Sequence, residues 1–218
     1  KDGNVEKAVI NGKEVPADLV VVAVGVKPNT DFLSGSGIEL GESDAVKVDE
    51  NFMTNVEDVY AAGDCVESVN LITGKPAWVP LGSTANKMGR ILSSNKYGSS
   101  SDRLDGVLCT MIVKIVDISA AKTGLTEKQA LSEGYDIETV VVPGNDTAGY
   151  YPGFKEIITK MIINKNDRRI LGGQVFGWGV VDKPIDILVA AITFKAKVDD
   201  LASLDLAYAP PFSNAMAS

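Results

Sequence analysis

The sequence contains no histidine, and this absence excludes several kinds of chemistry at once. Without an imidazole the chain cannot build a Ser-His-Asp triad or most zinc and iron sites, because histidine is their usual base or ligand. Cysteine occurs only at Cys65 and Cys109, far apart and without a C-x-x-C spacing. We therefore expect no metal site, and we expect the reducing cytoplasm as the compartment.

Positive charge and long apolar runs are also scarce. Lysine and arginine number 21 against 29 acidic residues, a net charge of −8 with no basic cluster, so we expect neither nucleic acid nor an anionic membrane as a partner. No apolar stretch reaches the roughly 18 residues of a membrane span, and no signal-peptide pattern is present. The 45% apolar and 23% charged residues are typical of a globular chain with one large or two small domains.

Two strands and an exit are expected in the first thirty residues. Residues 5–10 alternate in polarity, and Asn11-Gly12 is a strong hairpin turn. Leu19–Val24 is a continuous apolar run, which predicts a buried strand in a sheet covered on both faces. A free-standing hairpin is the alternative.

The region around Gly63 and Asp64 has the pattern of a ligand-binding sheet edge. Residues 59–62 form a short apolar run that predicts a buried parallel strand, and ligands of open α/β sheets bind at the carboxyl ends of such strands. Gly82-Ser83-Thr84 then supplies a hydroxyl cap ahead of a helix from Ala85 to about residue 97. The free amides of that helix would stabilise a partly anionic ring.

The flanking stretches suggest simpler elements. Residues 46–49 predict a short strand, and residues 67–78 predict a loop with its turn at residues 73–76. Gly98-Ser99-Ser100-Ser101-Asp102 has linker composition, so we place a domain boundary there.

From residue 103 onward the pattern changes to α+β. Strands are expected over residues 110–117, 137–142, 155–164 and 169–176, with the last two forming a hairpin. Thr126 and Gln129 form a capping box for a short helix that Gly134 stops. Asp182 is expected to cap a helix over residues 185–197 with Pro184 in its first turn.

That last helix carries more apolar surface than one sheet covers. One face holds Ile185, Leu188, Val189 and Ile192, and a second apolar group holds Ile187, Ala191 and Phe194. We expect part of this surface to form an interface, and the alternative is that all of it is core of a single chain.

Three motifs together resemble a known family. Thr54 followed by Val59-Tyr60-Ala61-Ala62-Gly63-Asp64 is similar to the second flavin-binding motif of FAD-dependent pyridine nucleotide-disulphide oxidoreductases. The stretches LGSTANKMGR (residues 81–90) and LAYAPPFSNA (residues 206–215) are most similar to the branch of coenzyme A-disulfide reductases, NADH oxidases and NADH peroxidases. The resemblance covers nearly the whole chain.

The resemblance implies an α/β fold of partial Rossmann-like FAD/NAD-binding segments followed by an α+β dimerisation domain. Residues 1–30 would end the NAD(P)-binding domain, residues 31–102 would be the second FAD-binding segment, and residues 103–218 would be the dimerisation domain. The cofactor would be FAD, with NADH or NADPH as co-substrate. Asp64 would bind the ribityl chain, and the backbone of Leu81 and Gly82 would meet the pyrimidine edge. The expected cofactor residues are Gly63, Asp64, Leu81, Gly82 and Ala85.

The resemblance also implies a substrate side formed by a homodimer. Tyr151 and Tyr208 would be catalytic residues offered to the partner subunit, with Tyr150 as the alternative in register and Asn86 as a further substrate contact. A tyrosine hydroxyl there can hydrogen-bond a thiolate or donate a proton. The alternative is that these tyrosines only pack at an interface. The basic residue that often follows APPF in the family would fall near Met216, so that contact is not expected.

Several parts of the family pattern are missing from the chain. Both G-x-G-x-x-G fingerprints and the segment with the redox-active cysteine are absent, and Cys65 and Cys109 are expected to be small buried apolar residues. The chain resembles the C-terminal half of an enzyme that reduces a disulfide such as coenzyme A disulfide, or oxygen or peroxide. We expect this polypeptide alone to have no turnover and to retain little FAD. The alternatives are a non-catalytic dimerisation module and a flavoprotein reductase acting on ferredoxin.

Overall fold

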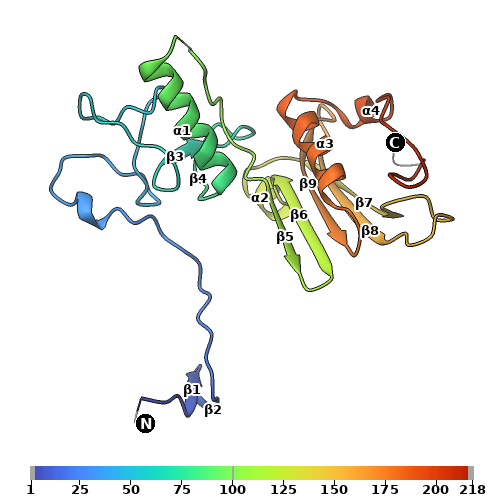
Figure 1. Cartoon of the computed structure of the whole chain (residues 1–218), viewed down its shortest axis with the longest axis horizontal. Helices are drawn as coiled ribbons and strands as arrows, with labels where there is room; N and C mark the ends of the chain where they lie inside the picture. The colour runs from blue at the N-terminus through green and yellow to red at the C-terminus, as the bar shows by residue number, and fades with distance from the viewer. Residues whose placement is uncertain (1–2, 100, 216–218) are drawn as a thin grey trace.

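The computed structural model describes residues 3–99 and 101–215, so Ser100 of the linker and Met216 lie outside the described residues. In chain order it has a small hairpin, an extended segment, a middle region around helix α1 (Gly82–Tyr97) and a C-terminal sheet with its helices (Figure 1). The sheet and α1 stand next to each other, and the hairpin lies apart from both. The expected combination of α/β segments with an α+β C-terminal part is confirmed.

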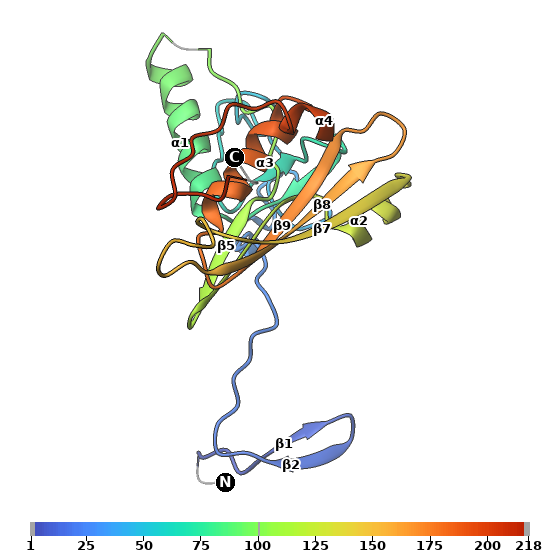
Figure 2. The ribbon, with the colours of Figure 1, turned by 90° about the vertical axis from the view of Figure 1, so that its right-hand side faces the viewer.

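The first hairpin consists of β1 (Lys7–Ile10) and β2 (Lys13–Pro16), paired antiparallel. Asn11 and Gly12 form its turn with φ values of 50° and 78°, the left-handed geometry of a two-residue hairpin turn. The predicted turn is confirmed. Figure 2 shows this hairpin at the end of the extended segment, away from the rest of the molecule.

Leu19–Val24 is not the buried strand that its apolar run predicts. The segment is extended but unpaired, and Leu19 and Val24 are 79% and 90% exposed. No described residue forms a ladder with it. The prediction of a buried strand is wrong for this chain because a strand is stabilised by hydrogen bonds from neighbouring strands, whatever its own hydrophobicity. The free-standing hairpin is the arrangement observed.

The middle region has its own small core but little regular sheet. It begins with the short helix η1 (Asp31–Leu33), and its core contains Val46, Phe52, Val66 and Met88. Val46 makes single bridges to Leu40 and Val66, and Tyr60 makes one to Met53. The predicted strands over residues 46–49 and 59–62 are therefore wrong, because a parallel strand forms only between partner strands and the described residues supply single bridges.

A short hairpin and a long helix complete the middle region. Residues expected to form a loop pair as β3 (Glu67–Val69) and β4 (Pro76–Trp78), with the turn between them. Helix α1 begins at Gly82, with Leu81 as its extended N-cap and no side-chain cap. The predicted hydroxyl cap is wrong because Ser83 and Thr84 already lie in the first turn.

The C-terminal part is a five-stranded antiparallel sheet in the order β5-β6-β9-β8-β7. Its strands are β5 (Met111–Ile115), β6 (Ile118–Gly124), β7 (Ile137–Asn145), β8 (Glu156–Asn164) and β9 (Ile170–Gly177). All four predicted strands are confirmed, and β7 continues three residues further than predicted. β6 was not predicted as a separate strand.

Helices cover both faces of this sheet. α2 (Glu127–Ser132) begins with the predicted capping box, in which Thr126 and Gln129 exchange bonds. α3 (Asp182–Thr193) packs on β6 and β9 and buries Ile185, Leu188, Ala191 and Ile192. Asp182 does not cap it, since the N-cap is Val181, and the helix ends before residue 197. α4 (Val198–Leu201) follows.

The apolar surface predicted for α3 is mostly core of this chain. Ala191 is buried and Ile187 is half-buried, whereas Phe194 is 83% exposed just after the helix. A larger exposed apolar group lies on strand β5 and on the side of the sheet away from α3. Its members include Met111, Val113, Ile115, Ile158 and Phe176.

Candidate functional site

Gly63 and Asp64 form a turn that faces helix α1. Gly63 takes φ 92°, a conformation that favours glycine, and its carbonyl accepts a hydrogen bond from the N–H of Val66 at 3.1 Å. The Gly63 N–H donates to Sδ of the buried Met88 at 3.4 Å, which holds the turn against the helix. A Cβ on Gly63 would lie 3.7 Å from Cβ of Ala85, an ordinary contact, so φ and not space requires glycine there. Asp64 is exposed.

The N-terminus of α1 is a ready donor of backbone hydrogen bonds beside this turn. Leu81 is extended, and its carbonyl accepts from the N–H of the half-buried Ala85 at 2.9 Å. No side chain caps the helix, so the first amides, beginning with that of the exposed Gly82, are available to a ligand. The helix dipole adds a positive partial charge at the same place.

This geometry fits the flavin role that the resemblance implies. An exposed carboxylate at Asp64 can accept hydrogen bonds from a polyol chain, and the amides after Leu81 can donate to an electron-rich ring edge. The residues expected at the cofactor (Gly63, Asp64, Leu81, Gly82 and Ala85) therefore lie in one place, on two segments that the Gly63–Met88 contact joins.

Asn86 lies on a different side of the helix start. It is exposed and lines an open hollow of about 760 Å³ together with Arg90, Ser93 and Arg103. Asn86, Arg90 and Ser93 are spaced by four and three residues, which puts them on one face of α1. Arg103 is ion-paired with Glu50.

The two aromatic motifs of the C-terminal half meet in space. The hydroxyl groups of Tyr150 and Tyr208 share a hydrogen bond of 3.1 Å, and Ala148 N–H donates to the Pro210 carbonyl at 3.2 Å. The hydrogen bond to Tyr150 raises the pKa of Tyr208. The pair thus joins Tyr208 to Tyr150, the register alternative, rather than to Tyr151. Tyr151 is 39% exposed in the same loop.

The loop that carries Tyr150 and Tyr151 is shaped by Asp146. Its carboxylate accepts from the N–H of Lys155 at 2.8 Å and from the N–H of Val180 at 3.2 Å. The terminal segment is fixed in turn by Lys183, whose Nζ donates to the Ala207 carbonyl at 3.2 Å. Both segments lie on the opposite side of the C-terminal sheet from α1 (Figure 1).

The two cysteines are half-buried free thiols. Sγ of Cys65 donates to the Ala62 carbonyl at 3.7 Å, directly behind the Asp64 turn. Burial raises the pKa of the Cys109 thiol, which opposes thiolate formation. Both side chains are therefore less buried than the small buried apolar residues that the sequence predicts.

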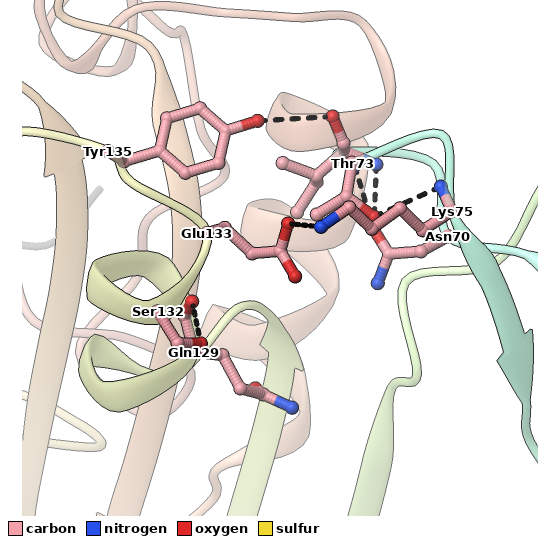
Figure 3. Close-up of polar contacts among 8 residues, drawn as sticks. Asn70, Thr73, Lys75, Gln129, Ser132, Glu133 and Tyr135 are labelled. Atoms are coloured by element: carbon pink, nitrogen blue, oxygen red, sulfur yellow. Dashed lines mark hydrogen bonds and ion pairs between the residues drawn. The ribbon is translucent and has the colours of Figure 1, made fainter.

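Two residues that were not predicted from the sequence are important near this site. Trp78 contacts the Asp64 turn, and Asn70 shapes the hairpin that connects this turn to the C-terminal sheet. Trp78 donates its indole N–H to the Asp64 carbonyl at 2.6 Å. Asn70 organises the turn of the β3–β4 hairpin, which contacts α2 and Tyr135 (Figure 3). The signal for the turn was present as Asn70 followed by Thr73-Gly74, whereas nothing local in the sequence indicated the partner of Trp78.

Two larger features are absent from the part of the chain that the structure describes. Over residues 3–99 and 101–215, no helix combines the length and hydrophobicity that crossing a membrane requires. Within the same residues, no three cysteine, aspartate or glutamate side chains gather in a way that could hold a metal ion.

Comparison with known protein families gives two matches, one to each half of the chain. A sequence model described as pyridine nucleotide-disulphide oxidoreductase matches residues 1–88, and one described as the dimerisation domain of these oxidoreductases matches residues 110–218. Together they cover most of the chain.

Individual proteins are similar along almost the whole chain. The NAD(P)H sulfur oxidoreductase (CoA-dependent) of Pyrococcus furiosus is 43% identical over 209 residues, which are 96% of this chain and 47% of that protein. The coenzyme A disulfide reductase of Staphylococcus epidermidis is 33% identical, with the same coverage of 96% and 47%. The solved structure of a NAD-dependent persulfide reductase from A. fulgidus is 46% identical with a TM-score of 0.92, over 99% of this chain and 40% of that one. The chain spans about half the length of the curated relatives it matches.

Proposed function

Because the chain belongs to the pyridine nucleotide-disulphide oxidoreductase family, we propose that it is the C-terminal half of a FAD-dependent NAD(P)H oxidoreductase with a sulfur acceptor. The single observation that supports this most is the Asp64 turn, held against the uncapped N-terminus of α1. A non-catalytic dimerisation module would not need an exposed carboxylate and free helix amides at the same point.

In this proposal the Asp64 turn and the N-terminus of α1 bind different portions of FAD. Asp64 binds the ribityl hydroxyls, and the amides after Leu81 donate to the pyrimidine edge. FAD held at this site would supply the capacity to accept hydride from NAD(P)H and to deliver electrons to the acceptor. The chain's own contribution is to bind and orient the ring and to stabilise negative charge on its pyrimidine side through the helix dipole.

We further propose that the active enzyme is a homodimer in which the tyrosines serve the partner subunit. The β7–β8 loop and the C-terminal segment, which carry the bonded Tyr150 and Tyr208, lie across the C-terminal sheet from α1, so we infer that they serve the Asp64 turn of a second copy (Figure 1). In the dimer one of the three tyrosines, with Tyr151 as the third candidate, would hydrogen-bond or protonate the sulfur substrate, and Asn86 would contact it. Phe194 and the exposed apolar side chains of β5 offer surface for a second copy.

The domain division that we propose rests on the same family membership. Residues 1–30 would complete an NAD(P)-binding domain, residues 31–102 the FAD-binding segment, and residues 103–218 the dimerisation domain. The unpaired run Leu19–Val24 supports this, because its exposed apolar side chains fit a sheet whose other strands come from the rest of the enzyme. The cytoplasm is proposed as the compartment, supported by the two free thiols.

The three proteins compared above are called a sulfur oxidoreductase, a coenzyme A disulfide reductase and a persulfide reductase, and a further relative at 35% identity is called an NADH oxidase. Sulfur is favoured as acceptor over oxygen or peroxide because the higher identities of 43% and 46% belong to the sulfur oxidoreductase and the persulfide reductase. A disulfide or persulfide of coenzyme A is therefore the substrate class that we propose.

Reconstitution from two polypeptides tests the proposal. The chain is mixed with the part of the Pyrococcus furiosus protein that it does not match, together with FAD, and the purified complex is examined for flavin absorbance, mass and NADH oxidation. We expect a yellow dimer that oxidises NADH when coenzyme A disulfide is added, and an Asp64→Ala chain that retains less flavin. NADH oxidation with oxygen alone would contradict the sulfur acceptor. A colourless dimer would indicate a non-catalytic dimerisation module instead.

A further inference from the structure

The tip of the β3–β4 hairpin has a shape fixed by its own sequence. Oδ1 of Asn70 accepts hydrogen bonds from the backbone N–H groups of Ile72 at 2.9 Å and Thr73 at 3.1 Å. The Gly74 N–H donates to the Asn70 carbonyl at 2.9 Å, and Gly74 takes φ 69°. Side-chain bonds of this kind stabilise one local conformation, so the tip acts as a single rigid unit.

This tip packs against the C-terminal domain (Figure 3). Ile72 packs against two apolar clusters of that domain, one beneath α3 and one beneath α2. Its carbonyl accepts from the Tyr135 hydroxyl at 3.4 Å, and Nζ of Lys75 lies 2.7 Å from a carboxylate oxygen of Glu133. The hairpin therefore contacts the C-terminal domain through both apolar and polar groups.

The contact between the hairpin and the C-terminal domain is closely packed, because a side chain at Gly106 would clash with the hairpin backbone. A Cβ at Gly106 would lie 2.8 Å from the Val69 carbonyl oxygen, whereas a Cβ at Gly124 would meet the Leu171 carbonyl oxygen at 2.4 Å before it reached Cδ1 of Ile72 at 3.1 Å. The Leu71 N–H also donates to the Val107 carbonyl at 3.0 Å. The hairpin cannot slide along the sheet without breaking this fit.

The other end of the hairpin holds the Asp64 turn. Trp78 pairs with Glu67 at the start of β3, and its indole N–H donates to the Asp64 carbonyl at 2.6 Å. Asp64 is only three residues before β3. A displacement of the hairpin therefore displaces Asp64.

We propose that the β3–β4 hairpin sets the position of the Asp64 turn relative to the C-terminal sheet, and that Ile72 and Trp78 are positioning residues for Asp64. This rests on the proposed flavin role of Asp64 and deepens it. Through the hairpin, the domain that carries the tyrosines also determines where the ribityl-binding carboxylate stands.

Hydrogen exchange on the 218-residue chain without flavin tests the mechanical link. Trp78→Phe keeps a ring and removes the donor, so we expect the amides of Val66 and Glu67 to exchange about tenfold faster, the effect of losing one hydrogen bond. Trp178→Phe is the matched control, because Trp178 is half exposed and lies edge-on to Phe176 in the C-terminal domain. It should leave these two amides at the parental rate.

The tip is tested in the same way. Ile72→Ala should also speed exchange at Val66 and Glu67, whereas Ile137→Ala, which removes a partly buried isoleucine from the cluster beneath α2, should not do so beyond its effect on global stability. The urea midpoint of each variant separates local loosening from global unfolding. Unchanged exchange in Trp78→Phe and Ile72→Ala, or a uniform rise along the chain, would overturn the proposal.

A flavin measurement then separates this inference from the proposed function. In the reconstituted complex we expect Trp78→Phe to retain less FAD than Trp178→Phe. Local loosening with unchanged flavin retention would confirm the link and contradict the flavin role of Asp64. Retention lowered without local loosening would contradict the link and leave the flavin role intact.

Discussion

Two apolar regions of this chain differ in whether their strands find partners. Residues 19–26 are extended, unpaired and exposed, whereas β8 and β9 are paired along their length and bury Ile162 and Val175. The partners of β8 and β9 lie close in sequence, since a five-residue turn joins the two strands. A strand of a parallel sheet needs partners that are distant in sequence. The difference shows that hydrophobicity predicts the need for burial, and that local pairing decides whether this chain can satisfy it alone.

The largest expected effect comes from truncating one side chain in each stretch. Ile162 is 0% exposed, so Ile162→Ala should lower the free energy of unfolding by about 2–5 kcal/mol. Val22 is 75% exposed, and Val22→Ala should change it by less than about 0.5 kcal/mol. Urea unfolding followed by circular dichroism measures both. Similar losses in the two variants would show that residues 19–26 are buried in solution and would remove the contrast.

A smaller effect distinguishes the starts of two helices. Thr126→Ala removes the side-chain cap of α2 and should cost about 1 kcal/mol. Ser83→Ala in the first turn of α1 should cost much less, because α1 has no side-chain cap. Both are measured by urea unfolding. A larger loss for Ser83→Ala would mean that the hydroxyl cap predicted from the sequence does form.

A pH-dependent effect is expected at the exposed pair of Arg168 and Asp199, joined by bonds of 2.6 and 2.7 Å. The guanidinium lowers the pKa of Asp199, so the pair contributes stability above the unfolded pKa of the carboxyl and loses it as pH falls through the folded pKa. Arg168→Met should return the Asp199 pKa toward its ordinary value in an NMR titration. Its stability deficit should be present at neutral pH and vanish in acid. Lys7→Met in the first hairpin is the control and should leave the Asp199 titration unchanged.

The smallest change is expected at the tyrosine pair. The hydrogen bond to Tyr150 raises the pKa of Tyr208, so any stability from it is present below the unfolded pKa and is lost as pH rises through the folded pKa. Tyr150→Phe should return the Tyr208 pKa toward its ordinary value in an ultraviolet titration. Tyr151→Phe is the matched control. A larger shift from Tyr151→Phe would show that the loop pairs Tyr208 with Tyr151 in solution.

Local sequence signals predicted the structure correctly where hydrogen bonds between near neighbours build the element. The Asn11-Gly12 turn, the capping box of Thr126 and Gln129 and the β8–β9 hairpin are of this kind. The strand predictions that failed are those in which a distant partner decides the outcome. Residues 59–62 have the composition of a parallel strand, yet Tyr60 makes only a single bridge to Met53.

The candidate site shows the same division. The sequence by itself indicated the residues that we propose bind flavin, because Gly63, Asp64 and the small residues at the start of α1 are all local features. It also determined four strands of the C-terminal sheet and the β8–β9 hairpin, through apolar runs and turn residues. Only the tertiary structure decided that Tyr208 pairs with Tyr150, that Trp78 donates to the Asp64 carbonyl and that Ile72 packs against the C-terminal domain. Each of these contacts joins residues fourteen or more positions apart, and their energies depend on packing and geometry that no single stretch of sequence contains.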